Sequence, residues 1–302
     1  MAKRFFCMSV IIILMFLCAC RKNETETIGQ EEAASEPVSG TVSEPISGTV
    51  SEPISGTVSE PESETITETV ETEEAKTSIH VENPSWDYYT SNNVQSGTRP
   101  YELKLLVQNT NEIIDTDAWF TRNNLTLQKD NTEEEYYGVV EGNGILVNIY
   151  KGDSWIAGLD FSDYMYSDDY VEEDVAYIEE TVHDARIRDG ILYVSTFHYT
   201  YAESAPSNAY ITAINLDDYS VIWKSEPLVC NSLNFEIVDD VIFCGYGFTS
   251  EPDYLYQIDR ITGCILAKQE LKSKPDYIIY KDGKLYVRTY NTDYVFEVEK
   301  QE

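Results

Sequence analysis

The stretch Asp189-Gly190-Ile191-Leu192-Tyr193-Val194 (DGILYV, residues 189–194) recurs along the chain, and its recurrence decides the fold. Each copy joins a tight turn to an apolar strand. Related segments begin at Asn143, Asp239 and Asp282, so that the four turns follow one another at intervals of 46, 50 and 43 residues. Asp-Gly and Asn-Gly between apolar runs predict hairpins, because both residues of such a pair accept positive φ.

A further strand follows each hairpin. The third strands are expected at residues 156–160, 211–215, 255–259 and 295–299, and fourth strands at 221–223 and 264–266. Tyr, Val and Ile dominate, and no helical period exceeds two turns, so the class is all-β. A four-stranded unit repeated at this spacing predicts the blades of a β-propeller.

The pattern predicts four blades, with residues 99–129 able to supply a fifth, incomplete one. The last blade contains only three strands, and we expect the segment from Tyr101 to Gln108 to add its fourth strand and close the ring. Closure would protect an edge strand that otherwise invites aggregation. A β-sandwich is the competing architecture.

Residues 211–223 and 255–267 resemble the blade motif of the pyrroloquinoline-quinone-like propeller family. In that motif, a strand ending near Asp, a turn with Gly and a strand ending in Trp follow one another. The motif positions are occupied by Asn215, Tyr219 and Trp223 in the first copy and by Asp259, Thr262, Gly263 and Ala267 in the second. The resemblance spans residues 142–299 and implies a propeller. Quinone-dependent enzymes of this kind use adjacent cysteines, which the domain lacks, so no cofactor is expected.

The N-terminus predicts export. Lys3 and Arg4 precede an uncharged, mostly apolar run, as in a signal peptide. The sequence Leu17-Cys18-Ala19-Cys20 resembles the lipobox of bacterial lipoproteins, which implies a signal peptide over residues 1–19 and acyl chains such as palmitate on Cys20. An uncleaved membrane anchor is the alternative, although its 15 apolar residues fall short of the roughly 20 that span a bilayer. We therefore expect a lipid-anchored protein that faces outside the cytoplasm.

Residues 20–79 have the composition of a tether. The octapeptide SEPVSGTV (residues 35–42) is followed by similar copies at 43–50 and 51–58. Each copy has one Pro, one Gly, one Glu and two aliphatic residues, which is too little apolar surface to offset the entropy of ordering the backbone. We expect a disordered, acidic tether over residues 20–79 and a folded domain over residues 80–302.

The charge excludes nucleic acid as a partner. The chain has a net charge of −33, and residues 80–302 alone carry 40 acidic and 16 basic side chains. Such a surface repels phosphate backbones. The acidic run from Asp160 to Asp174 lacks the spacing of a calcium-binding loop and is interpreted as a solvated loop. With three histidines in the chain, no metal site is expected.

Three cysteines remain in the predicted domain: Cys230, Cys244 and Cys264. Cys230 and Cys244 flank a predicted hairpin and could form a disulfide in an exported protein. Buried free thiols are the alternative. No CxxC spacing supports a zinc or thioredoxin-like site.

Aromatic residues gather in the connections between second and third strands, which a propeller presents on one face. They are Tyr150, Trp155, Tyr199, Tyr201, Tyr246, Phe248, Tyr290 and Tyr294. Aromatic side chains beside Asp, Asn and Gly suit a face that stacks sugars or grips a peptide. The alternative is that these residues pack against neighbouring blades.

The sequence favours a binding or scaffolding module for a protein, peptide or glycan at the cell envelope. One alternative is a glycan-cleaving enzyme, which needs two carboxylates about 5–10 Å apart. Glu179, Glu180 and Glu236 are candidates, but no catalytic residue can be assigned. His183-Asp184 resembles a dyad only in sequence, because neighbours on a strand point to opposite faces. A structural surface protein is the second alternative.

Overall fold

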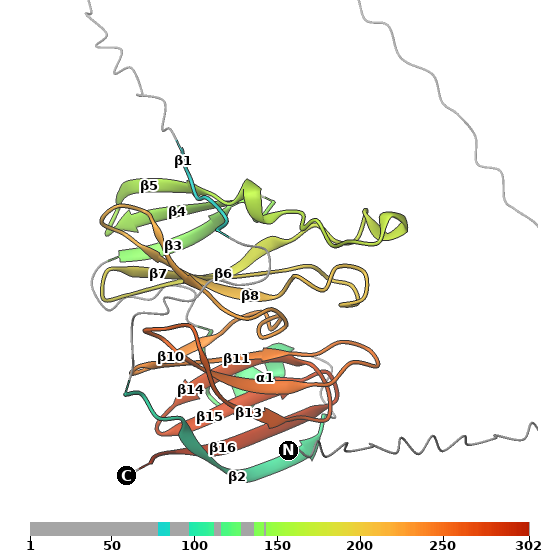
Figure 1. Cartoon of the computed structure of the whole chain (residues 1–302). Coiled ribbons are helices and arrows are strands. Elements are labelled where there is room, and N and C mark those ends of the chain that lie inside the picture. Colours follow the sequence, from blue (N-terminus) through green and yellow to red (C-terminus); the bar gives the residue numbers. More distant parts are fainter. Residues whose placement is uncertain (1–77, 85–96, 112–115, 128–135, 142, 302) are drawn as a thin grey trace, which may run out of the picture. The chain divides into compact units, whose positions relative to one another are not determined.

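The computed structural model of the chain describes residues 78–84, 97–111, 116–127, 136–141 and 143–301. These residues fall within one folded unit, residues 69–302. Within them, sixteen strands form four sheets of four strands each (Figure 1). The fold is therefore all-β with four blades of the propeller type, in place of the two sheets of a sandwich. The predicted signal peptide, Cys20 and most of the predicted tether lie outside the described residues.

Three of the sheets repeat one antiparallel pattern. The second sheet runs in the order β6 (Thr181–Arg188), β7 (Ile191–Phe197), β8 (Tyr210–Asn215) and β9 (Val221–Lys224). The third contains β10 (Glu236–Val238), β11 (Val241–Tyr246), β12 (Tyr254–Asp259) and β13 (Ile265–Glu270). The fourth contains β14 (Pro275–Lys281), β15 (Lys284–Thr289), β16 (Thr292–Lys300) and β2 (Tyr101–Thr110). Asp189, Asp239 and Asp282 all have a φ of 51° at the first turn of their sheet, as predicted for these hairpins.

Strand β2 completes the fourth sheet. It pairs antiparallel with β16, from Tyr101 opposite Lys300 to Thr110 opposite Thr292. The prediction that this segment supplies the missing fourth strand is confirmed. The described residues after β2, up to residue 127, contain the helix α1 (Thr116–Arg122) rather than a fifth blade.

The first sheet is inverted relative to the others, so that its first hairpin turn lies at the opposite end. It contains β3 (Tyr136–Glu141), β4 (Leu146–Lys151), β5 (Ser154–Asp160) and, parallel to β5, β1 (Ser78–His80). Its hairpin turn lies beside the beginning of β6, where the Val182 amide donates a 2.7 Å hydrogen bond to the Gly144 carbonyl. The turn at Asp189 lies at the opposite end of β6. We expected the Asn143-Gly144 turn to lie at the same end of the blades as the other three turns. This prediction is wrong, because the turn lies at the opposite end.

Apolar residues join the sheets in chain order. One cluster lies between the first and second sheets, another between the second and third, and another between the third and fourth. Because β7 is buried on both faces, its sequence opens with an unbroken apolar run, Ile191 to Val194, in place of alternating apolar and polar residues. None of the hydrophobic clusters in the described part of the chain joins the first sheet to the fourth, so closure of the ring stays a prediction. Helix α1 covers the fourth sheet instead, with Trp119 packed against Ile279.

Two short 3₁₀ helices, Ser162–Tyr164 and Glu172–Asp174, lie in the connection between the first and second sheets. No helix in the described part of the chain is long and apolar enough to cross a membrane.

Trp223 joins the second sheet to the third. Its indole Nε1 donates a 3.1 Å hydrogen bond to the Arg260 carbonyl. A Cβ on Gly263 would lie only 2.6 Å from the indole ring, and the φ of Gly263 is +76°, so only glycine fits beneath this ring. The Arg260 guanidinium reaches Asp189 and Asp240 at 2.8 Å each. This contact explains why the repeat ends one strand in Trp and places Gly in the following turn.

Replacing Trp223 by Ala should lower the free energy of unfolding by about 3–5 kcal/mol, because a large, fully buried side chain is removed and a cavity remains. Trp155→Ala is the matched control, since Trp155 is half-buried in β5. Urea unfolding of both variants measures the difference. An equal loss in the two variants would contradict the packing described for Trp223.

Candidate functional site

The connections between second and third strands lie at one end of the second, third and fourth sheets. They are residues 198–209, 247–253 and 290–291. The Ala202 amide donates a 2.7 Å hydrogen bond to the Glu251 carboxylate, which joins the first two connections. The Tyr290 amide donates to the Lys274 carbonyl at 3.1 Å. The hairpin with Tyr150 and Trp155 lies at the other end, because the first sheet is inverted, so the expected face shared by all blades is wrong for that sheet.

The eight aromatic residues singled out in the sequence occupy different environments. Tyr290 is 81% exposed, Tyr199 is 60% exposed and Tyr201 is 40% exposed, whereas Phe248 is half-buried. Tyr246 and Tyr294 belong to the hydrophobic clusters, because strand alternation points them at neighbouring sheets. Tyr150 stacks on Tyr137, and Trp155 donates a 2.8 Å hydrogen bond to Asn148. Of these eight residues, four therefore lie at the shared end of the three sheets and also have an accessible ring: Tyr199, Tyr201, Phe248 and Tyr290.

Phe248 and Tyr290 form part of the wall of a pocket of about 350 Å³. The remaining lining residues are polar: Thr249, Ser250, Asp253, Ser273, Lys274 and Asp276. An adjacent pocket of about 550 Å³ includes Tyr201 and shares Thr249 and Ser250 with the first. Tyr201 meets Phe248 edge to face, with ring centroids 4.8 Å apart. We call the first pocket the Phe248–Tyr290 pocket.

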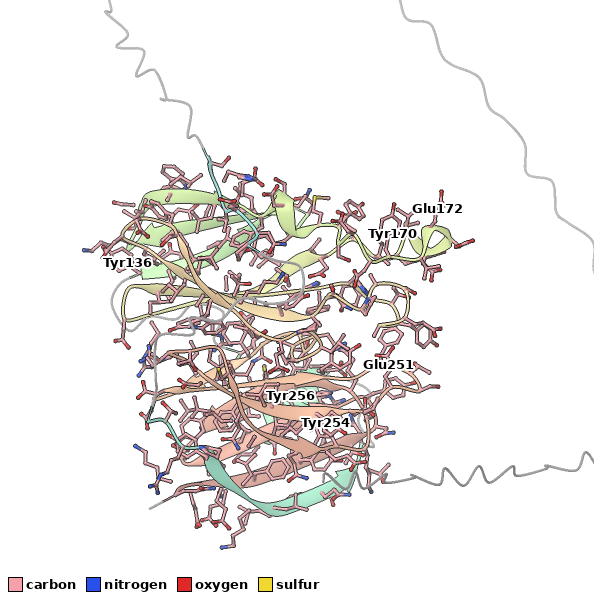
Figure 2. All side chains as sticks on the ribbon, viewed as in Figure 1. Tyr136, Tyr170, Glu172, Glu251, Tyr254 and Tyr256 are labelled. Atoms are coloured by element: carbon pink, nitrogen blue, oxygen red, sulfur yellow. The ribbon has the colours of Figure 1, made fainter. Side chains whose placement is uncertain are left out.

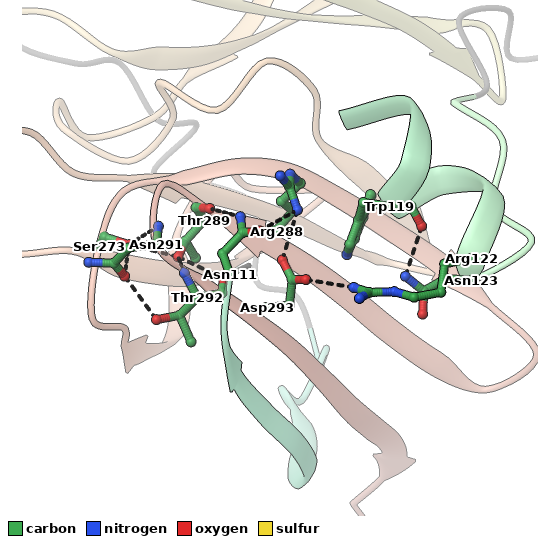
Figure 3. Close-up of polar contacts among 10 residues, drawn as sticks. All are labelled: Asn111, Trp119, Arg122, Asn123, Ser273, Arg288, Thr289, Asn291, Thr292 and Asp293. Carbon is green, nitrogen blue, oxygen red and sulfur yellow. Dashed lines mark hydrogen bonds and ion pairs between the residues drawn. The ribbon is translucent and has the colours of Figure 1, made fainter. Parts of the chain in front are cut away.

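A network of hydroxyl and amide groups holds the turn that carries Tyr290 (Figure 3). The Ser273 hydroxyl lies 2.7 Å from the Thr289 hydroxyl and 2.7 Å from the Asn291 side-chain oxygen. The Asn111 amide, just beyond β2, donates a 2.7 Å hydrogen bond to the Asn291 carbonyl. Because both sides of the turn are bonded, the backbone of Tyr290 is held while its ring stays exposed.

Charged residues continue this network toward α1 (Figure 3). Arg288 donates to the Asp293 carboxylate at 3.2 Å and to the Asn111 side-chain oxygen at 2.9 Å. Arg122 of α1 donates to the other oxygen of Asp293 at 2.9 Å. The Arg288 guanidinium also lies over the Trp119 ring, 5.9 Å from its centroid. Helix α1 therefore supports the same turn from the opposite side.

The Phe248–Tyr290 pocket contains groups of both charges. The Lys274 ammonium lies 3.0 Å from the Asp276 carboxylate. Burial, reinforced by the nearby Glu251, raises the pKa of Asp253 to about 6. A Cβ on Gly247 would collide with the Asp253 carboxylate, so a larger residue there would displace the Asp253 side chain. The pocket thus offers two aromatic faces, hydroxyl groups, an ammonium and carboxylates to a ligand.

The three carboxylates considered for catalysis do not come together as a free pair. Glu179 is exposed and accepts a 3.3 Å hydrogen bond from Tyr166. Glu236 binds Arg186 at 3.3 Å, and burial raises the pKa of Glu236 to about 7. Glu180 is buried elsewhere, and burial raises its pKa to about 8 although Lys224 opposes the shift.

The sequence reasoning considered Asp184 only as a neighbour of His183 and missed its place in a cluster of buried charged side chains. Arg186 binds the Asp184 carboxylate at 3.0 Å as well as Glu236, so one guanidinium joins the innermost strands β6 and β10. His183, its neighbour, accepts from the Tyr199 hydroxyl at 3.1 Å on Nδ1 and lies 3.2 Å from the Phe197 carbonyl through Nε2. His183 and Asp184 therefore have separate partners and form no dyad. The only feature of the sequence that could have indicated this cluster is that its charged residues lie on the strands predicted to be innermost in their blades.

Cys230 and Cys244 are completely buried free thiols, and Cys264 is exposed. No disulfide joins Cys230 and Cys244 in the structure, and a bridge between them in an oxidising compartment stays a prediction. The described residues include no group of three or more His, Cys, Asp or Glu side chains that could hold a metal ion.

No family model matches the chain, and no curated protein sequence matches it. Among solved structures, BamB from Moraxella catarrhalis is 11% identical, covers 54% of this chain and 55% of its own length, and has a TM-score of 0.30. Myxococcus xanthus glutaminyl cyclase is 12% identical over 56% of this chain and 72% of its own, with a TM-score of 0.33. Bacteroides ovatus xyloglucan PUL GH43B is 15% identical over 55% of this chain and 36% of its own, with a TM-score of 0.32. The chain thus spans about half of BamB. Likeness at this level carries no argument about function.

The buried carboxyl of Glu180 should make stability depend on pH. Its pKa of about 8 lies above the ordinary value of 4.5, so folding favours the protonated form. The stabilisation is complete below about pH 4.5 and is lost as the pH rises through 8. Glu180→Gln removes this titration, so the variant should gain stability relative to the parent chain between pH 5 and pH 9, measured by urea unfolding. A stability difference that does not change with pH would contradict this assignment.

Proposed function

We propose that the folded domain is a binding module whose ligand occupies the Phe248–Tyr290 pocket. The observation that carries the proposal is the exposed ring of Tyr290 on a turn fixed from both sides, in a pocket that Tyr290 lines together with Phe248 and six polar residues. An aromatic ring that is held at the surface, where it does not stabilise the hydrophobic core, is typical of a residue that recognises a ligand.

Glycan fragments are the ligand class that fits this pocket best. The apolar faces of sugar rings stack on Tyr and Phe, while sugar hydroxyls bind carboxylates, ammonium groups and hydroxyls. Asp253, Asp276, Lys274 and Ser273 supply those groups around the two rings. A short peptide is the second ligand class, since the same groups bind backbone amides and polar side chains.

A glycan-cleaving enzyme is the weaker alternative. Asp184 and Glu236 lie on adjacent innermost strands, but Arg186 binds both of them. A carboxylate that is ion-paired in this way cannot serve as a general acid without first leaving its partner. The binding function needs no such rearrangement.

The cellular setting forms part of the same proposal. The lipobox resemblance supports acylation of Cys20 and attachment to the outside of the cytoplasmic or outer membrane. The contact of Trp223 with Gly263 supports membership in the pyrroloquinoline-quinone-like propeller family without its cofactor. The acidic tether would then hold the binding domain away from the bilayer.

Tyr290→Ala should abolish ligand binding without unfolding the protein. A thermal-shift screen with glycans, peptidoglycan fragments and short peptides would first identify a ligand, because saturation at about 100 times Kd stabilises a protein by about 2.7 kcal/mol. Calorimetric titration of that ligand should then show at least a tenfold loss of affinity in the variant. Tyr280→Ala is the control, since Tyr280 is an exposed tyrosine outside the pocket. Unchanged binding by Tyr290→Ala would contradict the proposed site.

Cys20→Ser should release the protein from membranes. Two or more acyl chains anchor a protein stably, and the variant cannot carry them on this residue. Membrane fractionation and mass spectrometry of the mature N-terminus measure the change, with Cys18→Ser as the control. Membrane retention of the Cys20 variant at the level of the control would contradict lipid anchoring at this residue.

A further inference from the structure

A second surface lies apart from the Phe248–Tyr290 pocket, in the loop of residues 165–179 that precedes β6. We call it the acidic aromatic loop. Figure 2 shows Tyr170 and Glu172 on the part of this loop that projects beyond the sheets. Its large exposed apolar side chains, between 41% and 66% exposed, are Tyr166, Tyr170, Val171, Val175 and Tyr177. An apolar patch gathered in one short segment marks an interaction surface.

All the charged residues of the loop are acidic. The loop contains six acidic residues and no Lys, Arg or His. Asp168, Glu172 and Glu173 are exposed beside the aromatic rings. Such a surface repels nucleic acid and anionic lipid headgroups, which restricts the partner to a neutral or basic one.

The loop is well anchored to its neighbours. The Val171 amide donates a 2.7 Å hydrogen bond to the Ser204 carbonyl, and the Ser204 hydroxyl donates at 2.6 Å to Asp174. The Asp169 carboxylate accepts from the Ser207 amide at 3.1 Å. Ile178 is buried at the base of the loop. The exposed rings are thus presented on an ordered backbone, which lowers the entropy lost when a partner binds.

We propose that the acidic aromatic loop docks a partner protein through an arginine-rich surface of that partner. A guanidinium stacks on a tyrosine ring and at the same time binds a carboxylate with two hydrogen bonds. Tyr170 and Tyr177 supply the rings, and Glu172 and Glu173 supply neighbouring carboxylates. Lysine offers a point charge without the planar stacking, so arginine should be preferred. This surface acts independently of the proposed pocket.

The test uses the full-length chain and a nona-arginine peptide, with nona-lysine for comparison, in calorimetric titrations at low and high salt. The charge variant is Glu172→Gln with Glu173→Gln. Its matched control is Glu102→Gln with Glu299→Gln, which removes the same charge from exposed positions on β2 and β16. The aromatic variant is Tyr170→Ser with Tyr177→Ser, and its control is Tyr280→Ser, at an exposed position on β14. Tyr290→Ser is measured as well and reports on the Phe248–Tyr290 pocket. Near-ultraviolet circular dichroism confirms that each variant is folded.

We expect nona-arginine to bind more tightly than nona-lysine, and added salt to weaken both. The charge variant should lose about 3- to 10-fold in affinity and its control less than twofold. The aromatic variant should lose about fivefold or more in affinity, while Tyr280→Ser should bind like the parent chain. The proposal is overturned if nona-arginine does not bind, if the charge variant and its control lose equally, or if the aromatic variant binds normally. If only Tyr290→Ser loses affinity for nona-arginine, the peptide binds in the Phe248–Tyr290 pocket, and the proposal for the acidic aromatic loop is overturned.

Discussion

The pairing of β2 with β16 is the constraint on which the fourth sheet depends. It brings a strand near the beginning of the described chain against its last strand, across about 190 residues of sequence. Without β2, β16 would present an unpaired edge. The same N-terminal region also touches the other sheets: β1 pairs with β5, Asn83 accepts from Lys224, and the Tyr101 amide donates to Gln257 at 2.7 Å. Contacts with all four sheets therefore come from one region of sequence.

The pairing of β2 with β16 also positions the turn that carries Tyr290 in the candidate site. Asn111 follows directly after β2 and bonds to the Thr289 and Asn291 carbonyls on either side of the Tyr290 turn. Arg288 and Asp293 join that turn to α1. The pocket itself is lined by residues 248–290, but Asn111 and Arg122, far away in sequence, hold the turn that carries Tyr290, so this turn depends on long-range strand pairing.

Much of the fold could be predicted from the sequence because hairpins are local. Asp189 and Asp282, each followed by Gly, mark turns whose backbone geometry needs no distant partner. The orientation of the first sheet could not be predicted, since an Asn-Gly turn has the same signature at either end of a sheet. The site was predicted only in part. Tyr290 and Phe248 lie in the pocket, but Tyr246 is buried because strand register, invisible in the loop pattern, turns it toward another sheet.

Native-state hydrogen exchange of the full-length chain tests the central claim most directly. Amides that share a sheet open together, so residues 101–110 and 292–300 should exchange at matching rates and lose protection at the same denaturant concentration. The segment around residues 289–292 should lose protection with them. Rapid exchange over residues 101–110 while residues 292–300 remain protected would contradict the account, because β2 would then not hold the sheet that carries the site.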